Sequence, residues 1–533
     1  MDPLIAALRD PGCYPHPVEK VEIVETHISW VLLAGEYAYK LKKPVRLPFL
    51  DFSTLQARRH YCEEELRLNL RTAPELYLDV LPIVKTAGGL SFVGAGAPLD
   101  YAVRMRRFPA DALADRMART GTLGPAQIDA IAQTVARFHA TLPAAAAPAG
   151  FGTAARVSAP ALGNFDQLAA LPAADGSRAE LARLLAWTAQ ECGRLAAVFD
   201  ARHTAGFVRE CHGDLHLGNI AFVDGRAVPF DGIEFDPALR WIDVMSEVAF
   251  LVMDLLGHGL PALAWRLLNA CLEASGDYEG LAVLRFYLVY RAMVRAKVAL
   301  LRADPAAYRS HLALAGSLTI PSRAALLVMH GLSGSGKTTA SQALSERIGA
   351  VRLRSDVERK RLHGLPATAR SASAPGADLY DAASGERTYA RLADLAAAAI
   401  RSGYAVIVDA AFLRRDERHR FRALAARLGV EHLIVSCETP DAVLRERIAL
   451  RTAQASDASE AEVPVLERQL ALQHALTSDE AASAVFVDTG NESGLRLGVE
   501  AVAARLARRN SAALAPAAGA RNQKHGYGAV SHH

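Results

Sequence analysis

The pattern of apolar and polar positions predicts two halves that are built differently. In the first half, residues 28–33 and 37–42 alternate in polarity around a short turn, which predicts a β-hairpin. A helix is expected from about Ser53 to Arg71, with Ser53 able to cap it. The other elements expected here are strands at 78–84 and 100–108, and helices at 124–141, 177–204 and most of 241–318. A small stranded lobe followed by a helical lobe is therefore predicted.

The second half alternates short apolar runs with helices. Strands are expected at 324–330, 350–354, 404–409, 432–437 and 484–488. Continuous apolar runs of this kind are typical of a parallel sheet that is covered on both faces. A short linker around residues 319–323 separates an expected domain of residues 1–318 from one of residues 324–508. The Ala/Gly-rich residues 509–533 are expected to form a disordered tail.

Composition limits the class of protein. The chain has 533 residues, enough for at least two domains, and a formal net charge of +3, which is too small to indicate a nucleic-acid partner. Its six cysteines are scattered without a C-x-x-C pair, which favours reduced thiols over disulfides or a zinc site. No signal-peptide pattern is present, and the most apolar helix, around Val248 to Leu256, is too short to span a bilayer. We therefore expect a soluble, cytoplasmic protein without a membrane partner, and leave its oligomeric state open.

One stretch of the second half carries specific chemistry. It follows the first apolar run, precedes a helix, and matches G-x-x-x-x-G-K-[ST] with the residues Gly331, Leu332, Ser333, Gly334, Ser335, Gly336, Lys337, Thr338 and Thr339. The loop amides and the helix N-terminus would face phosphate, where partial positive charge gathers. Lys337 is expected to reach the β- and γ-phosphates of ATP, and the Thr338 hydroxyl to hold Mg²⁺. Asp409, which ends the run 404–408, is the expected second magnesium ligand.

The order of motifs in this half resembles the small P-loop kinases: gluconate kinase, shikimate kinase, and the polynucleotide kinase and zeta-toxin group. The resemblance implies that Asp356, after the second strand, takes the proton of the acceptor hydroxyl and that Arg359 holds an anionic group of the acceptor. It also implies that Arg447 and Arg451, on a lid helix, reach the phosphates. Three plainer readings stay open: Ser355 or Asp356 capping a helix, Asp409 capping a turn, and solvated surface arginines.

The first half contains a second dense stretch, residues 211–220, with the pattern H-G-D-x-H-x-x-N, followed by a run that ends in Asp231. This order resembles the catalytic and metal loops of aminoglycoside phosphotransferase-like kinases. The resemblance implies that Asp214 accepts or orients the acceptor's hydroxyl proton and that Asn219 and Asp231 hold the metal. A polar turn between a helix and a hairpin is the alternative.

The ATP-binding lysine of this half is left open. Lys40 and Lys42 point to one face of the expected strand, and Glu64 or Glu65 of the following helix would pair with the ATP lysine. Lys40 stands where the family's strand lysine falls. No G-x-G-x-x-G loop precedes it, which departs from protein kinases. The alternative is ordinary surface charge.

These features predict an α/β and α+β protein: a two-lobed, protein-kinase-like fold followed by a P-loop kinase domain with a parallel α/β/α sheet, an arrangement similar to tandem bacterial chains. The predicted function is an ATP- and Mg²⁺-dependent phosphotransferase with two modules acting on hydroxyls of small molecules. Both Asp214 and Asp356 are present, which favours catalysis over a regulatory ATP-binding protein with one or both halves as pseudokinases. A zeta-toxin-like kinase of nucleotide sugars is a further alternative.

Overall fold

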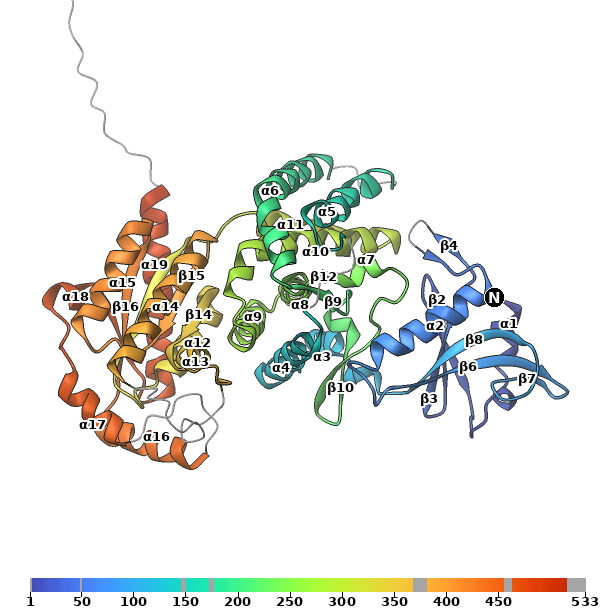
Figure 1. Ribbon diagram of the computed structural model, residues 1–533, viewed down its shortest axis with the longest axis horizontal. Helices are drawn as coiled ribbons and strands as arrows, with labels where there is room; N and C mark the ends of the chain where they lie inside the picture. The colour runs from blue at the N-terminus through green and yellow to red at the C-terminus, as the bar shows by residue number, and fades with distance from the viewer. Residues whose placement is uncertain are drawn as a thin grey trace, which may run out of the picture.

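The computed structural model describes residues 2–47, 50–144, 150–171, 177–367, 381–454 and 463–514, without the side chains of residues 451–454, 463–465 and 509–514. Figure 1 shows three bodies in a row: a stranded lobe (blue), a helical lobe (cyan to yellow-green) and a P-loop half (yellow to red). The chain passes through them in this order. The catalytic motifs of the first half lie where its two lobes meet.

The stranded lobe is a six-stranded antiparallel sheet of order β1-β2-β3-β8-β6-β7. Its strands are β1 (Val21–Glu25), β2 (Ser29–Ala34), β3 (Tyr37–Lys42), β6 (Tyr77–Thr86), β7 (Gly89–Ser91) and β8 (Pro98–Arg106). Helix α2 (Leu55–Asn69) packs on the sheet through Cys62, which contacts Val103 in a small buried cluster. The short elements α1 (Pro3–Ala7), β4 (Arg46–Leu47) and β5 (Leu50–Asp51) complete the lobe.

The helical lobe begins after β8. Its helices are α3 (Ala114–Thr120), α4 (Pro125–Thr141), α5 (Ala154–Ala169), α6 (Arg178–Thr204), α7 (Pro237–Arg240), α8 (Val244–Gly257), α9 (Pro261–Ser275), α10 (Leu281–Leu301) and α11 (Pro305–Leu318). Two antiparallel ribbons lie against the stranded lobe: β9 (Val208–Glu210) with β12 (Trp241–Asp243), and β10 (Ile220–Val223) with β11 (Arg226–Pro229). Helix α8 is buried along nearly its whole length, so the lobe is organised around it.

The P-loop half is a five-stranded parallel sheet of order β14-β15-β13-β16-β17. Its strands are β13 (Ala325–His330), β14 (Ala350–Arg354), β15 (Ala405–Asp409), β16 (Glu431–Glu438) and β17 (Ala484–Asp488). Its helices are α12 (Lys337–Ile348), α13 (Ser355–Leu362), α14 (Ala382–Arg401), α15 (Arg415–Leu428), α16 (Asp441–Gln454), α17 (Val463–Leu472), α18 (Ser478–Ser483) and α19 (Glu492–Leu514). The predicted fold class is confirmed.

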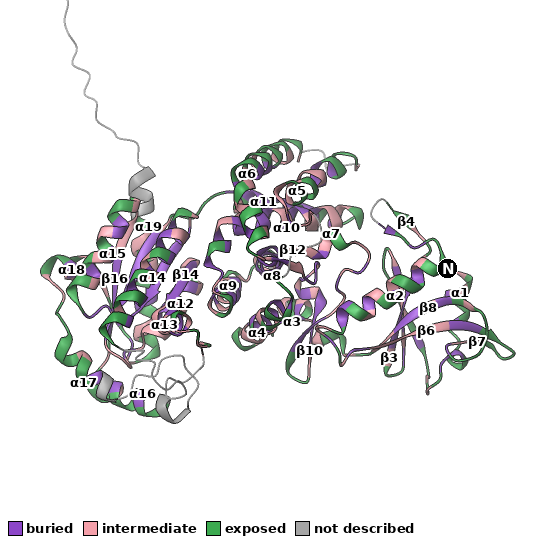
Figure 2. Cartoon of the chain, viewed as in Figure 1, coloured by how far each residue is buried: buried purple, intermediate pink, exposed green. Residues whose placement is uncertain are grey.

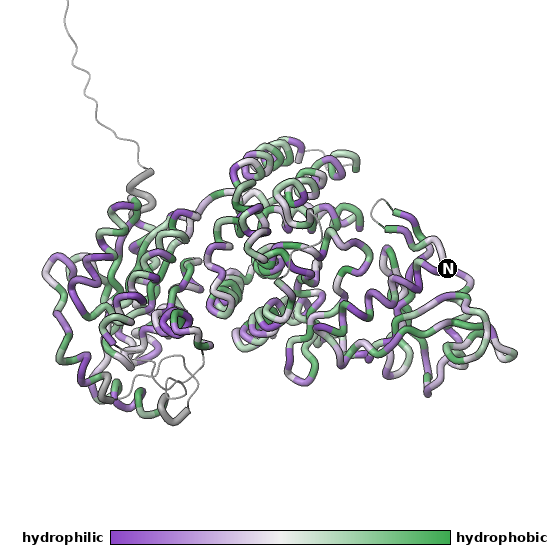
Figure 3. The backbone as a smooth tube through the Cα atoms, in the orientation of Figure 1, coloured by the Kyte–Doolittle hydropathy of each residue, from purple (hydrophilic) through white to green (hydrophobic). Residues whose placement is uncertain are grey.

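Strand β13 shows why the sheet is covered on both faces. Leu326 and Val328 enter one apolar core, and Leu327 and Met329 enter another on the opposite face, because side chains alternate along a strand. The first of these cores continues without a break into the helical lobe. In Figure 2 the strands of this sheet are buried while the outer helices carry exposed faces, and Figure 3 shows hydrophilic and hydrophobic positions alternating along those helices. Among the described residues, no helix combines the length and apolarity needed to cross a bilayer.

The structure differs from the predicted elements at several places, among them helix α5, which lies where no element was predicted. Helix α2 is capped by Thr54, whose hydroxyl accepts the Ala57 N–H, rather than by Ser53. The region expected to be helical from residue 241 opens with strand β12, since it pairs with β9. Helix α19 runs to Leu514, so the first residues of the expected tail are helical; residues 515–533 lie outside the described part of the chain.

Candidate active sites

The glycine loop between β13 and α12 has a backbone that only glycine adopts easily. Gly331, Gly334 and Gly336 have φ values of 143°, 83° and 77°, in the left-handed region. A Cβ atom at Gly334 would lie 2.8 Å from the Leu444 carbonyl oxygen of α16. The loop therefore leads its main chain into the N-terminus of α12, where phosphate is favoured.

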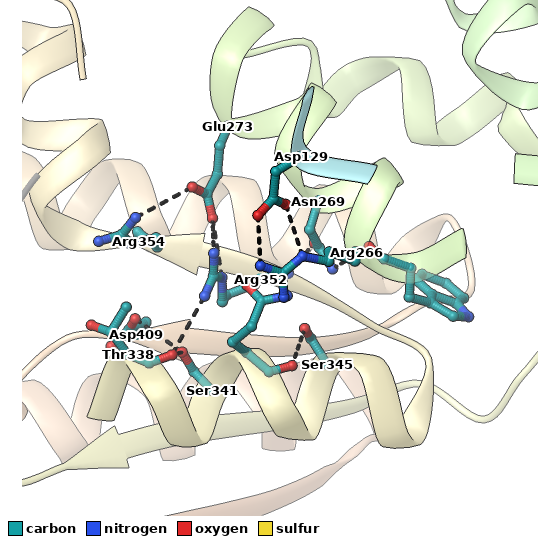
Figure 4. A network of polar contacts seen from close by, with 12 residues as sticks. Asp129, Arg266, Asn269, Glu273, Thr338, Ser341, Ser345, Arg352, Arg354 and Asp409 are labelled. Carbon is teal, nitrogen blue, oxygen red and sulfur yellow. Dashed lines mark hydrogen bonds and ion pairs between the residues drawn. The ribbon is translucent and has the colours of Figure 1, made fainter. Parts of the chain in front are cut away.

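The lysine and the expected magnesium ligands meet at this loop. Lys337 Nζ donates to the Leu332 carbonyl oxygen at 2.7 Å, so the amine lies over the loop. Asp409 is buried and accepts a hydrogen bond of 3.0 Å from Ser341 Oγ, one helical turn after Thr338 (Figure 4). A hydroxyl and a carboxylate are hard oxygen ligands, so Thr338 and Asp409 fit Mg²⁺.

The acceptor residues of this half lie at the same edge of the sheet. Arg354, the last residue of β14, stands in register with Asp409 of β15. Asp356 follows two residues later in the first turn of α13, and Arg359 Nη1 donates to its Oδ1 at 3.0 Å. The helix has no side-chain cap, so the alternative in which Ser355 or Asp356 caps it is not what the structure shows. The Asp356 carboxylate is held by a guanidinium near the phosphate loop.

Of the two arginines expected on the lid helix, Arg447 has a described side chain and Arg451 does not. Arg447 Nη2 donates to the Thr489 carbonyl oxygen at 2.6 Å and its Nη1 approaches the Gly334 carbonyl at 3.4 Å, so this arginine touches the phosphate loop. The side chain of Arg451 lies outside the described residues. Gln469, on α17, accepts a 2.8 Å hydrogen bond from the Ser333 N–H. Nothing in the sequence pattern pointed to this glutamine.

In the first half, both lysines of β3 are buried and reach the same carboxylate. Lys40 Nζ donates to Glu65 Oε1 at 2.8 Å and also pairs with Asp231, while Lys42 pairs with Glu65 and Glu234. Burial alone would raise the pKa of Glu65, but the two lysines outweigh it and lower that pKa to about 2. Glu65 is therefore a carboxylate shared by two ammonium groups.

These contacts separate the two lysines and the two glutamates that the sequence left open. The Lys42 side chain is fully buried, whereas Lys40 also contacts Asp231, whose side chain is 42% exposed. Lys40 is thus the lysine at the open side of the cluster. Glu64 instead pairs with Arg67 at 2.7 Å and Arg240 at 2.8 Å, so the partner of the lysines is Glu65.

The loop of residues 211–220 brings the other expected residues together. Asn219 Nδ2 donates to the Asp214 carbonyl oxygen at 2.9 Å and to its carboxylate at 3.2 Å. Burial would raise the pKa of Asp214, but His216, His212 and Arg291 lower it well below its ordinary value. His216 Nδ1 accepts the Gly218 N–H, so its other nitrogen faces Asp214 at 3.6 Å. Asp214 is therefore charged at neutral pH and positioned by its own loop.

Asp231 has a strained backbone. Its φ is 64°, unusual for a residue with a Cβ, and its N–H donates to the Tyr77 hydroxyl at 3.1 Å. The next N–H, of Gly232, donates to Asn69 Oδ1 at 2.9 Å. Tyr77 and Asn69 of the stranded lobe thus hold the backbone at Asp231 in this strained conformation. Backbone strain of this kind is common at functional sites. The Asp231 and Asn219 side chains offer oxygen atoms that suit Mg²⁺.

Side chains of helices α8 and α10 bond to the main chain of the loop formed by residues 211–220. Glu247 accepts the Gly213 N–H at 2.8 Å and contacts His139 Nε2 at 2.7 Å. Asp254, two turns later on α8, accepts the Leu217 N–H at 2.9 Å, and Arg291 donates to the Gly213 carbonyl oxygen at 3.2 Å. The backbone on both sides of Asp214 is therefore fixed by buried charged groups.

Relatives of this chain match it over most of its length. The uncharacterized protein Rv2004c of Mycobacterium tuberculosis is 30% identical over 463 residues, which cover 84% of this chain and 91% of that protein. The uncharacterized protein Mb2027c of Mycobacterium bovis matches to the same extent. This chain belongs to their family.

The two halves match different family models. A phosphotransferase enzyme family matches residues 60–274, and an AAA domain matches residues 326–476. Both halves therefore belong to phosphotransferase or kinase families, which confirms the predicted tandem. Among solved structures, a gluconokinase from Sinorhizobium meliloti 1021 is 21% identical over 35% of this chain and 98% of its own, with a TM-score of 0.26. The GDP complex of aminoglycoside 2′-phosphotransferase-IIIa is 15% identical over 60% of this chain and 99% of its own, with a TM-score of 0.35.

Sequence reasoning missed three carboxylates of the first half: Glu234, Glu247 and Asp254. A signal for Glu234 existed, because two lysines on one strand face need more than one carboxylate when they are buried. Glu247 and Asp254 are seven residues apart in an apolar helix, which places them on one face toward the catalytic loop.

Proposed function

We propose that this chain is an ATP- and Mg²⁺-dependent kinase with two catalytic modules, each transferring the γ-phosphate of ATP to a hydroxyl of a small molecule. The observation that carries the proposal is the meeting of Lys337, Thr338, Asp409 and Asp356 at one edge of the parallel sheet. A phosphate loop, metal ligands and a carboxylate for the acceptor are the parts that phosphoryl transfer needs.

In the second half, the loop amides and Lys337 would bind the β- and γ-phosphates, and Arg447 would approach them from the lid. Mg²⁺, when held by Thr338 and Asp409, supplies charge compensation for the phosphates. Asp356 would orient the acceptor hydroxyl and take its proton, while Arg359 holds the carboxylate in place. The acceptor enters beside β14, where these two residues lie.

In the first half, Lys40 would bind phosphate from the open side of the lysine cluster, and Asn219 and Asp231 would hold Mg²⁺. Asp214 would orient the acceptor hydroxyl. Its lowered pKa leaves it ionised at neutral pH, which suits orientation and electrostatic stabilisation of the attacking hydroxyl more than strong general-base catalysis.

A cavity in the helical lobe supports a small acceptor for this module. It has a volume of about 190 Å³ and is lined by aromatic side chains, including Phe151, Trp241 and Tyr290, together with Asp236 and Arg291. Arg291 also donates to the Gly213 carbonyl oxygen, next to Asp214 in the chain. Apolar walls with few charged groups are typical of small-molecule sites.

Binding calorimetry with ATP and Mg²⁺ tests the proposal. We expect two sites in the parent chain, one in Lys337→Ala and one in Asp231→Ala, because each variant removes a charge that only one module uses. Arg347→Ala, which breaks an exposed ion pair between Arg347 of α12 and Glu500 of α19, is the control and should keep both sites. A single site that is lost in Lys337→Ala and unaffected by Asp231→Ala would show that the first half is a pseudokinase.

The acceptors can be sought directly. Incubation of the parent with ATP and a metabolite extract should give compounds that gain the mass of one phosphate. Products that persist in Lys337→Ala and vanish in Asp214→Asn belong to the first module, and the reverse pattern belongs to the second. Hydrolysis of ATP with no phosphorylated product would favour a regulatory ATPase.

A further inference from the structure

The helical lobe of the first half is fastened to the edge of the P-loop sheet. Strand β14 is an edge strand, and Asn269 of α9 pairs with its main chain: Nδ2 donates to the Ala350 carbonyl oxygen at 3.0 Å, and Oδ1 accepts the Arg352 N–H at 2.7 Å. The amide side chain thus satisfies an edge that would otherwise attract another strand. Helix α9 also packs against α12, the helix that begins at the phosphate loop.

Close packing supports these bonds. Gly349, which ends α12, has a φ of 69°, and a Cβ there would lie 2.8 Å from the Trp265 indole of α9. Arg266 of α9 donates to Glu346 of α12 at 2.8 Å and to Asp129 of α4 at 2.7 Å (Figure 4). The two halves therefore share one interface with a continuous core and fixed polar contacts.

Glu273, at the C-terminal end of α9, is the residue of this interface that lies toward the phosphate loop. Its carboxylate accepts from Arg352 Nη2 at 2.6 Å and Nε at 3.0 Å, and Arg354 Nη1 approaches it at 3.5 Å. Both arginines belong to β14, and Arg352 is buried. Figure 4 shows Glu273 on one side of this pair, with Thr338, Ser341 and Asp409 on the other.

The two arginines connect Glu273 to the phosphate site. Arg352 Nη1 approaches the carbonyl oxygen of Thr338, the expected magnesium ligand, at 3.5 Å. Arg354 stands in register with Asp409, the other expected ligand, and precedes Asp356 by two residues. Two guanidinium charges thus border a site that must hold a divalent cation, and Glu273 supplies the neighbouring negative charge.

We propose that Glu273 is a positioning residue for the P-loop site, so that the first half completes the magnesium and phosphate site of the second. Glu273 contacts Arg352 and Arg354 from the side away from the metal ligands, where it fixes both guanidinium groups and offsets their charge. Without it, a buried guanidinium loses its partner beside Thr338, which disfavours Mg²⁺ by repulsion. The inference rests on the function proposed for Lys337, Thr338 and Asp409.

The test compares two carboxylates of the same interface in the full-length chain: Glu273→Gln and, as the matched control, Glu346→Gln. Both changes remove one charge that faces an arginine across the boundary between the two halves. Glu346, however, lies about 13 Å from Lys337 along the axis of α12, away from the phosphate loop. The measurement is calorimetry of ATP at several Mg²⁺ concentrations, read at the site that Lys337→Ala removes. Thermal unfolding of each variant is recorded in parallel.

We expect Glu273→Gln to weaken binding of Mg²⁺-ATP by about tenfold and to raise the Mg²⁺ concentration needed for half-saturation, since groups behind metal ligands commonly matter by about 10- to 100-fold. Glu346→Gln should stay within about twofold of the parent, in line with a partly exposed pair. Equal behaviour of the two variants would overturn the inference. Failure of Lys337→Ala to remove any site would instead overturn the proposed function.

A double variant separates positioning from general loss of structure. Glu273→Gln combined with Arg352→Gln removes the buried Arg352 guanidinium together with its partner, so it should bind Mg²⁺-ATP more tightly than Glu273→Gln alone. A merely structural role predicts the opposite, because two lost contacts would add. Binding by the double variant that is equal to or weaker than that of Glu273→Gln would therefore contradict the proposal.

Discussion

The two candidate phosphate sites of this chain are built by opposite means. In the second half, the candidate site is a run of consecutive residues whose main-chain amides would bind phosphate. Its glycines Gly331, Gly334 and Gly336 have φ values in the left-handed region. In the first half, it is a set of charged side chains from separate segments, with Lys40, Glu65 and Asp231 in contact. A local motif makes one site, and the packing of two lobes makes the other.

This difference decides whether a substitution in the site affects ligand binding alone or folding as well. Lys337 bonds to a carbonyl oxygen of the loop itself, so its loss should affect ligand binding more than folding. Glu65 is completely buried between two ammonium groups, so its loss should affect folding as well. The first site is therefore coupled to the stability of its domain, and the second is coupled much less.

The largest expected effect is on transfer itself. Asp356→Asn in the second module and Asp214→Asn in the first should each slow transfer by about 10²- to 10⁴-fold while ATP affinity stays near that of the parent, because we propose that both carboxylates act on the acceptor. Single-turnover rates with an identified acceptor, together with ATP calorimetry, measure this. An equal loss of ATP affinity would place the residue among the metal ligands instead.

The next effect is on stability. Glu65→Gln should lower the free energy of unfolding of the first half by about 3–5 kcal/mol, since it leaves Lys40 and Lys42 buried with fewer partners. Glu64→Gln, at the neighbouring residue, should cost less, because its partner Arg67 is half exposed and its other partner, Arg240, keeps an ion pair with Glu210. Urea denaturation of the full chain provides the comparison. Similar losses for the two variants would remove the distinction between the sites.

A third test separates the two lysines of β3. Lys40→Met should weaken ATP binding at the site that Asp231→Ala removes by about 10- to 100-fold, the usual worth of a hydrogen bond to a charged group. Lys42→Met should leave that affinity within about threefold and act on stability, because its side chain is fully buried away from the open side. Calorimetry that found the reverse order would exchange their roles.

The smallest effect is a pH dependence in the second half. His330, which precedes the glycine loop, is buried, and burial with the nearby charges of Arg418 and Lys337 lowers its pKa from 6.5 to about 4. Between pH 6.5 and 4, His330 is protonated in the unfolded chain but not in the folded one. Its contribution to the free energy of unfolding is therefore fully present above about pH 6.5 and is lost as the pH falls toward 4. His330→Gln should make the melting temperature of this half depend less on pH between about 4 and 6.5. An unchanged slope would mean that another group titrates there.

Much of the fold could be predicted because it rests on local rules. The five strands of the P-loop sheet follow from continuous apolar runs, and the structure has each of them. The glycine loop needed only its own residues and the strand and helix beside it. The short strands β4, β5 and β7 and the cap at Thr54 were missed, since brief edge elements and neighbouring hydroxyls carry little periodic signal.

The sequence by itself determined the tandem order, the phosphate loop, and the set of lysines and carboxylates from which the first site is made. Only the tertiary structure decided which of them meet. Glu64 and Glu65 differ by about 100° around a helix, so the docking angle of α2 selects Glu65 as the partner of Lys40 and Lys42. The contact of Glu273 with Arg352 joins residues 79 apart in sequence and in different halves, and no spacing rule reaches that far. Such pairs depend on how whole faces pack, because burial without a partner would leave each charge uncompensated.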